Sequence, residues 1–392
     1  MAIRVSIVIP TRNRPAMAVL AIRAALNAAG NDDEVIVADN GDLPLSVERG
    51  DARLRVLRDE RVYSMPENWE RGVRAARGQD LVLLSDRHRL VPGSLDHLLA
   101  ARSDERDVVT YSYATLSQQL PSTAVDSFDV IAEAPGTLAY SRGARERRER
   151  LSRDVLDDWY ATMRYRFERP MLTSALVPRR IVADVVRSHG RFFEGMAPDV
   201  SSSLHILAAT ERYVETNVMA ILGQFPSTDP RWSNGLSLAR GQHAGSFLKE
   251  FAGAPLGQFP PSISAVIYQT LAEFSRLHPV SAAPHVLDIS RFARAAAIEL
   301  ESAARVDRAA MHWALFRATQ AAGPSPRALF QQLRTVVSGR LLGFGRLARR
   351  LRALLGPRDS APVWSTAGSL AHNQTLAEGM TLVERANGPV IW

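Results

Sequence analysis

Apolar runs alternate with helix-like patterns over the first part of the chain. A near-continuous β-branched run spans Ile3 to Pro10 and is followed by a polar turn and an apolar-periodic stretch from Met17 to Ala29. Continuous apolar runs of this length are typical of buried strands, and apolar positions at helical spacing are typical of helices that cover a sheet. The pattern therefore predicts strand, loop and helix in that order.

The same alternation continues to residue 90. One short apolar run lies within Glu34–Asp42 and is followed by Asp39-Asn40-Gly41. A second run spans Leu54 to Leu57, and a third begins at Leu81. Between the last two, Asn68–Gly78 predicts a short helix that stops at its terminal glycine. Strands that alternate with helices predict an α/β fold with a mostly parallel sheet and helices on both faces.

Composition bounds the class of protein. The 392 residues are 46% hydrophobic and 23% charged, which predicts a folded chain of two domains or of one domain with a large extension. The absence of cysteine excludes disulfides, cysteine-ligated zinc, iron–sulfur clusters and thiol nucleophiles, and it fits a reducing cytoplasm. No secretory leader and no apolar run of about 20 residues is evident, so we expect a cytoplasmic protein.

Two common nucleotide-binding motifs are missing. The first strand is not followed by GxGxxG, and the chain contains no GxxxxGK[ST]. The missing motifs disfavour a dinucleotide-binding Rossmann domain and a P-loop protein.

The segment LVLLSDRHRL carries candidate metal chemistry. A strand beginning at Leu81 leads directly into Asp86 and His88. Residues two apart in an extended segment share one side, and carboxylate and imidazole suit Mn²⁺ or Mg²⁺ bridging a diphosphate. In the alternative, Arg87 or Arg89 binds the phosphate oxygens and the metal matters less.

Four segments in order resemble a known family. They are VSIVIPTRNRP, EVIVADNG, NWERGVRAARGQDLVLLSD and LVPGSLDHLL, and together they resemble the amino-terminal half of family-2 glycosyltransferases, which have the GT-A fold. The resemblance covers about the first 115 residues closely and the chain to about residue 240 more loosely. It implies inverting transfer from a nucleoside-diphosphate-sugar donor, most often UDP-linked. The family usually has two or three acidic residues where this chain has Asp86-Arg87-His88.

The resemblance also implies residue roles at the donor. Asp86, His88 and the late His243 would hold the divalent metal. Asp39 would accept the N3–H of uracil, although Asp39-Asn40-Gly41 alternatively only shapes a turn. The residues expected to bind the nucleotide are Pro10, Thr11, Arg14, Asp39, Asn68, Ser85 and Asp86.

The acceptor side is expected further along the chain. Asp199 lies at the start of an apolar-periodic helix and is similar to the family's acidic motif, which implies a general base for the acceptor hydroxyl. In the alternative, Asp199 is only a helix cap, and Glu194 is the reserve candidate at the acceptor. Trp232, in the Pro- and Gly-rich loop Phe225–Gly245, would stack on a sugar ring.

These features suggest a division of the chain. We expect a GT-A domain over residues 1–245, with a nucleotide-binding half at 1–115 and an acceptor half at 116–245, and a mainly helical extension at 246–392. The densely charged Ser141–Asp154 predicts a solvated helix or a loop. Within the extension, the stretches Ile263–Leu277 and Ile289–Gln320 predict helices.

The basic character of the chain is concentrated in residues 327–358. This segment has eight arginines and no acidic residue, against a formal net charge of +7 for the chain. Arginines interleaved with apolar residues predict a peripheral helix on an anionic membrane, here the inner face of the plasma membrane. Packing on the transferase domain or in a homo-oligomer is an equal alternative, and nucleic acid is disfavoured because no binding motif is present.

The sequence thus predicts an inverting glycosyltransferase of bacterial glycan, glycolipid or natural-product biosynthesis. A non-catalytic nucleotide-sugar-binding or membrane-associated assembly protein with a degenerate metal motif is the main alternative. A nucleotidyltransferase is a third possibility, but its glycine-rich phosphate loop is missing. Lys249 is the single lysine among 48 basic residues, which indicates a GC-rich bacterial genome.

Overall fold

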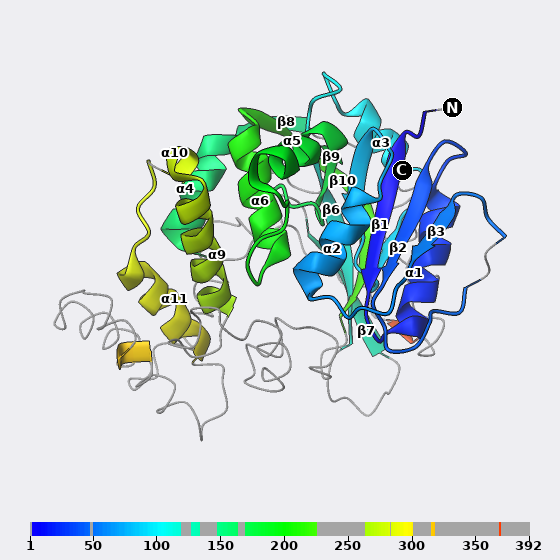
Figure 1. Ribbon diagram of the computed structural model, residues 1–392, viewed down its shortest axis with the longest axis horizontal. Coiled ribbons are helices and arrows are strands. Elements are labelled where there is room, and N and C mark those ends of the chain that lie inside the picture. Colours follow the sequence, from blue (N-terminus) through cyan, green and yellow to red (C-terminus); the bar gives the residue numbers. More distant parts are fainter. Residues whose placement is uncertain are drawn as a thin grey trace.

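A computed structural model of the chain describes residues 2–47, 50–118, 127–133, 147–163, 169–225, 263–282, 284–300, 315–317 and 368–369. These residues form a mixed β-sheet flanked by helices (Figure 1). The strands are β1 (Val5–Thr11), β2 (Glu34–Asp39), β3 (Leu54–Leu57), β4 (Asp80–Leu83), β5 (His88–Leu90), β6 (Val109–Gln118), β7 (Ser127–Glu133), β8 (Arg147–Leu151), β9 (Ala175–Pro178), β10 (Arg212–Phe225) and β11 (Gly368–Ser369). The helices are α1 (Pro15–Ala28), α2 (Met65–Arg74), α3 (Ser94–Ala100), α4 (Ser152–Thr162), α5 (Arg179–His189), α6 (Pro198–Ala209), α9 (Ile263–Leu277), α10 (Pro279–Ala282) and α11 (Ile289–Leu300).

The sheet has a parallel half and a mixed half. Strands β3, β2, β1 and β4 are neighbours in that order and run parallel. Strand β9 is antiparallel to both β4 and β6, β7 is antiparallel to β6, and β10 is parallel to β6 and antiparallel to β5 and β8. The predicted α/β class is confirmed, and the mostly parallel arrangement describes the amino-terminal strands, where βα units alternate.

Strand β1 lies inside the sheet although it contains Pro10. Its parallel pairing with β4 reaches Val8 opposite Leu83, whereas its pairing with β2 continues to Thr11 opposite Asp39. Proline cannot donate a backbone hydrogen bond, so it is tolerated where one neighbouring strand has already ended. Pro10 therefore lies in the part of β1 that still pairs with β2 but no longer pairs with β4.

The alternating side chains of β1 supply two cores. Ile7 and Ile9 pack with α1 and α3 on one face, together with Ile22 and Leu98. On the other face Val8 belongs to a larger core formed by α2, α4, α5, α6 and α9. Burial on both faces explains the continuous apolar run, because successive side chains in a strand point to opposite sides.

Helix α2 differs from the prediction at both ends. It begins at Met65, after Ser64, whose backbone N–H and hydroxyl both donate to Glu67, and it ends at Arg74. Gly78 lies beyond the helix, so its predicted role as the helix stop is wrong. A Cβ at this position would lie 2.5 Å from the backbone nitrogen of Ser6, so a glycine is required for the close approach to β1.

The charged stretch Ser141–Asp154 also differs from the prediction. Arg147–Leu151 forms β8 rather than a helix or a loop, and α4 begins directly after it. β8 pairs antiparallel with β10, and its side chains are mostly exposed. Dense charge is compatible with a strand here because the backbone pairs at the sheet edge while the side chains remain in solvent.

Helices α9 and α11 pack against α6 and α4. Helix α9 contacts α6 and α11, and Figure 1 shows α9–α11, in yellow, beyond α6 from strands β1–β3. The helix predicted over Ile263–Leu277 is confirmed, and Ile289–Leu300 is helical at the start of the second predicted stretch. The predicted domain boundary near residue 245 and the segment 327–358 lie outside the described residues, so both stay predictions.

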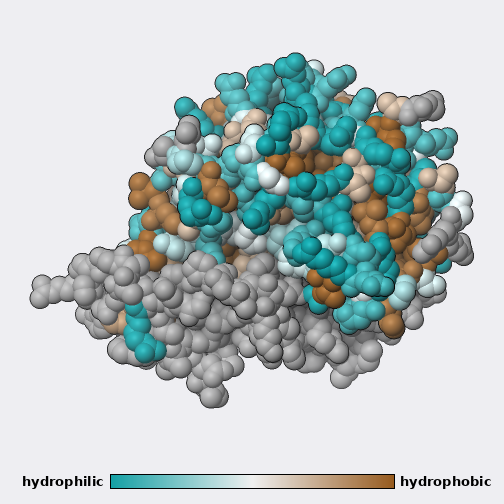
Figure 2. Space-filling model, in the orientation of Figure 1, coloured by the Kyte–Doolittle hydropathy of each residue, from teal (hydrophilic) through white to brown (hydrophobic). Residues whose placement is uncertain are grey.

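Figure 2 shows one face of the molecule. Among the described residues on this face, hydrophilic residues are interspersed with patches of hydrophobic residues. Within the described residues, no helix combines the length and apolar character that a membrane span requires.

Candidate functional site

The candidate site lies at the carboxyl ends of the parallel strands. Thr11 ends β1 opposite Asp39, which ends β2, and the chain leaves β4 at Leu83 toward Asp86. Adjacent parallel strands end at one edge of a sheet, and ligands bind preferentially outside that edge. Candidates from three separate sequence segments therefore meet at one edge.

Asp86 is the centre of this cluster. Its side chain is 1% exposed, and Oδ2 accepts a hydrogen bond of 2.9 Å from Thr11 Oγ1. The same oxygen lies 3.2 Å from Arg14 Nε in an ion pair. Three residues expected to bind the nucleotide are thus in direct contact, and the carboxylate is held in one orientation by the turn after β1.

The segment after Asp86 is a tight turn into β5. The backbone N–H of His88 donates to the carbonyl of Ser85 at 2.8 Å, and His88 is paired with Gly223 of β10. Burial, followed by the neighbouring Arg87 and Arg89, lowers the pKa of His88 to about 3. The imidazole is therefore neutral at physiological pH, which is the form that binds metal ions.

Arg89 places a buried positive charge behind this turn. It is 2% exposed, and Nη1 donates to the carbonyl oxygens of His88 at 2.9 Å and Asp86 at 3.3 Å. Burial lowers the pKa of Arg89 to about 10, against the opposing effect of Asp86, so the guanidinium stays charged at neutral pH. Its Nε and Nη2 have no hydrogen-bond partner among the described residues.

Asp39 organises the loop after β2. Its Oδ1 accepts from the backbone of Gly41 at 3.0 Å, and its Oδ2 accepts from the backbone of Leu45 and from Arg58 Nη1, each at 2.9 Å. Asp39 therefore shapes the turn, as the alternative interpretation of Asp39-Asn40-Gly41 predicted. A carboxylate oxygen can accept two hydrogen bonds, so Oδ1 keeps capacity for a ligand donor.

Asn68 and Pro10 lie at the same edge of the sheet, Asn68 on α2 and Pro10 in β1. Asn68, on α2, donates from Nδ2 to the carbonyl of Ala38 at 2.9 Å, while its buried Oδ1 has no hydrogen-bond partner among the described residues. Pro10 is buried in β1, one residue before Thr11.

Asp199 lies in the first turn of α6, after Pro198. Its Oδ1 accepts from the backbone of Val200 at 2.9 Å, and the N-cap of α6 is Ala197, so Asp199 is a first-turn residue and not the helix cap. The first turn is tied to β4, because Ser202 Oγ accepts from the Leu172 backbone and the Leu172 carbonyl accepts from Leu83. Asp199 therefore belongs to an element fixed against the same strand that leads to Asp86.

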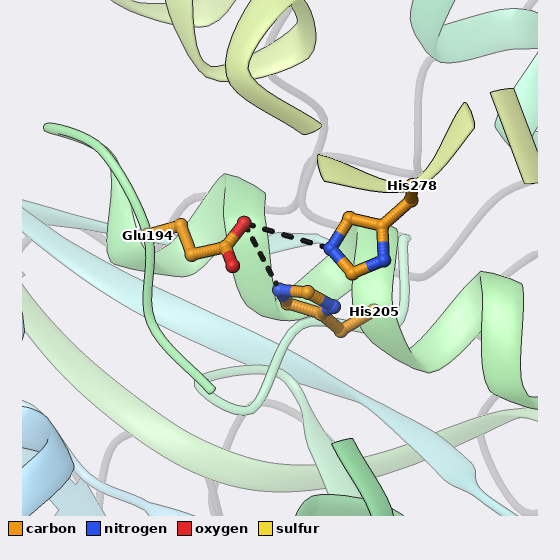
Figure 3. Close-up of side chains that lie close together, drawn as sticks. All are labelled: Glu194, His205 and His278. Carbon is orange, nitrogen blue, oxygen red and sulfur yellow. Dashed lines mark ion pairs between the residues drawn. The ribbon is translucent and has the colours of Figure 1, made fainter. Parts of the chain in front are cut away.

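Glu194 lies in the buried loop before α6 and meets two histidines. Its Oε2 is 3.4 Å from His205 Nε2 and 3.7 Å from His278 Nε2 (Figure 3). Sequence reasoning missed both histidines, because His205 sits within an apolar helix pattern and His278 is far away in the chain. Only the packing of the extension brings them together.

Sequence reasoning also missed the arginines that support the site. Arg58 pairs with Asp39, and Arg71 donates to the carbonyls of Asp39 and Leu57. No local motif marks these arginines, because each reaches the site from a different element. The predicted residues Trp232 and His243 lie outside the described residues.

Residues 6–163 have a match among known protein families. This segment matches the model of Glycosyl transferase family 2. No curated protein sequence matches the chain.

Solved structures offer more distant likenesses. One is the crystal structure of S. aureus TarS 1-349 in complex with UDP-GlcNAc, with a TM-score of 0.43 and 15% identity over 87% of this chain and 92% of that chain. Another S. aureus TarS structure gives a TM-score of 0.39 and 14% identity over 86% of this chain and 55% of that chain. The assignment therefore depends on the family model.

The matched segment contains the strands and turns that form the candidate site, from Thr11 through Asp39 to His88. The recognition made from the order of four sequence segments is confirmed. Residues 6–163 of this chain match the model of glycosyl transferase family 2.

Proposed function

We propose that this chain transfers a sugar, with inversion, from a nucleoside-diphosphate-sugar, most readily a UDP-sugar, to an acceptor hydroxyl. The observation that carries the proposal is the contact of Asp86 with Thr11 and Arg14 at the carboxyl ends of β1 and β4. It joins a buried carboxylate, a hydroxyl and a guanidinium where a charged donor would enter. The family match of the same residues supports this assignment.

At the donor, we assign the base to Asp39 and the edge of the nucleoside pocket to Pro10, Thr11 and Asn68. The remaining acceptor capacity of Asp39 Oδ1 suits the N3–H of uracil, which cytosine lacks. Arg58 and the loop backbone hold this carboxylate in place. Arg14 and Ser85 complete the proposed nucleotide contacts.

We assign a divalent cation, Mn²⁺ or Mg²⁺, to Asp86 and His88, with His243 as a further ligand. A carboxylate and a neutral imidazole form a donor set that fits such an ion. When bound, the cation would neutralise charge on the leaving diphosphate. The buried charge of Arg89 supports an alternative in which Arg87 and Arg89 carry more of that task.

At the acceptor, we assign the general base to Asp199. Inverting displacement requires a base that takes the proton of the attacking hydroxyl, and the first turn of α6 fixes this carboxylate. The buried carboxylate of Glu194 faces His205 and His278, which favours Asp199 over Glu194 for this role. Trp232 remains the proposed platform for the acceptor sugar.

Nucleotide binding tests the donor proposal. Calorimetry with UDP, GDP and dTDP, with and without Mn²⁺, would be performed on the native chain and on Asp86→Ala. Tight UDP binding that needs both Mn²⁺ and Asp86 supports the donor class and the metal site together. Binding that is independent of metal shifts the diphosphate role to Arg87 and Arg89. Absence of all nucleotide binding contradicts the transferase proposal and favours a non-catalytic protein.

For the acceptor, we propose a bacterial glycan, glycolipid or natural product, reached by a cytoplasmic enzyme at the inner face of the plasma membrane. The arginine-rich segment 327–358 supports the membrane component through its charge. Flotation with anionic vesicles tests it. Binding by the native chain that is lost when Arg349, Arg350 and Arg352 are changed to Gln supports the proposal. Equal binding by both proteins contradicts it.

A further inference from the structure

We infer that Glu194, His205 and His278 form a site for a divalent transition-metal ion of the zinc type. Glu194 precedes α6, His205 lies on α6, and His278 follows α9, so three separate elements supply the side chains (Figure 3). Their ligand atoms all lie within 4.8 Å of one another. This site is distinct from the donor cation proposed at Asp86 and does not depend on the proposed function.

One carboxylate oxygen faces both imidazole nitrogens at distances close to those between two ligands of one metal ion. Glu194 Oε2 lies 3.4 Å from His205 Nε2 and 3.7 Å from His278 Nε2, and none of these three atoms has a hydrogen-bond partner among the described residues. Two ligands at about 2.0–2.1 Å from a tetrahedral zinc ion lie about 3.3–3.4 Å apart. One carboxylate oxygen facing two imidazole nitrogens is the arrangement that a shared ion would produce.

The surroundings explain why an ion is needed. The three side chains are buried, with exposures of 4% for Glu194, 1% for His205 and 7% for His278. Aromatic rings surround them, since Phe274 stacks on His278 and Phe192 lies 5.7 Å from His205 between ring centroids. A buried carboxylate oxygen without a hydrogen bond is costly, and a bound cation would satisfy it and both imidazole nitrogens at once.

The loop and helix geometry fixes two of the three ligands. The backbone N–H of Glu194 donates to Ser201 Oγ at 3.0 Å, and the backbone N–H of His278 donates to the carbonyl of Phe274 at 2.8 Å. An ion at this site would therefore connect the α9–α10 junction to the helix that carries Asp199. Because its ligands come from the loop before α6, from α6 and from the residue after α9, we assign the ion the role of tying α9 to α6.

Elemental analysis tests the inference on the full chain. After expression with added zinc and purification without chelator, the native protein is expected to retain about one metal ion per chain, as structural zinc sites do. His205→Gln and His278→Gln should each lose it. The matched control is His285→Gln, a histidine of the same extension that instead contacts Asp157 and stacks on Tyr160. A second control, Asp86→Asn, should retain the metal and thereby separates this site from the donor site.

Two measurements on the native protein keep the test independent of the folding of the variants. Removal of the metal with a chelator should lower the melting temperature, and added Zn²⁺ should restore it. Co²⁺ added to the metal-free protein should give a visible d–d absorption band that saturates at about one equivalent. A native protein that holds no metal, gives no cobalt band and does not change its melting temperature overturns the inference. Equal metal retention in native, His205→Gln and His278→Gln proteins also overturns it.

Discussion

The hydroxyl of Thr11 donates to Asp86 Oδ2 at 2.9 Å, and these two residues are 75 positions apart in sequence. The bond joins the end of β1 to the turn that follows the parallel strand β4. Arg14 reaches the same oxygen at 3.2 Å. These contacts bring polar side chains from two strand ends into one buried, charged cluster.

Asp86→Asn should reduce sugar transfer by about 100-fold or more, because the variant loses the charge needed by both the cation and Arg14. Steady-state kinetics at several Mn²⁺ concentrations measures the effect, and the loss should be larger at low metal. Thr11→Val, which removes only the supporting hydroxyl, should lose about 10-fold to 100-fold, as is usual for outer-shell partners of a metal. Unchanged activity in Asp86→Asn would show that the carboxylate has no part in transfer.

Asp199→Asn should lower kcat by about 10²–10⁴ with little change in the donor KM, because a general base acts in the transition state. The asparagine oxygen can still accept from the Val200 backbone, so α6 should keep its start and the melting temperature should change little. Separate kcat and KM values, with the melting curve, distinguish catalysis from capping. Near-normal turnover with a lowered melting temperature would mean that Asp199 is only a helix-start residue.

Gly78→Ala should destabilise the protein by about 1–3 kcal/mol, because the added Cβ would lie 2.5 Å from the Ser6 backbone nitrogen and force overpacking. Urea unfolding measures the change. Gly50→Ala is the matched control, since a Cβ there meets nothing within 4 Å. Equal stability of the two variants would contradict the close approach between the α2–β4 loop and β1.

Glu34→Gln should reduce stability at pH 7 by about 1–3 kcal/mol, because charge-assisted hydrogen bonds to the Glu34 carboxylate are lost. Ser6 Oγ and the Arg77 backbone each donate to it at 2.7 Å. Although burial opposes them, these contacts lower the pKa of Glu34 below its ordinary value of 4.5.

The sign of the pH dependence follows from this lowered pKa. The stabilisation is fully present above pH 4.5 and is lost as the pH falls through the lower pKa of the folded state. Urea unfolding from pH 7 to pH 3 should therefore show the native and Glu34→Gln proteins converging in stability. Glu105→Gln, at an exposed position, should follow the native protein throughout. A constant difference between native and Glu34→Gln proteins at all pH values would contradict the role of the ionised carboxylate.

Local sequence determined the elements of the first half and the polar residues at their ends. The β-branched runs that give β1 and β2 are buried on both faces, and such runs are recognisable because several consecutive residues, and not only every second one, are apolar. Asp39 was identifiable because it ends the run that gives β2, and Asp86 because it comes shortly after the run that gives β4. Parallel neighbours end at one edge, so their proximity also follows from the strand pattern.

Tertiary structure decided what strand pattern and spacing do not encode. Gly78 looks like a helix stop in sequence, but the reason for it is the backbone of Ser6. Arg58 and Arg71 resemble ordinary surface arginines until their partners are known.

The cluster of Glu194, His205 and His278 is the clearest case of a long-range effect. It exists because α9 packs on α6, and that packing results from burial of apolar side chains far apart in the chain. Sequence pattern fixes which face of each helix is apolar. Only the folded chain decides which polar side chains are enclosed together when those faces meet.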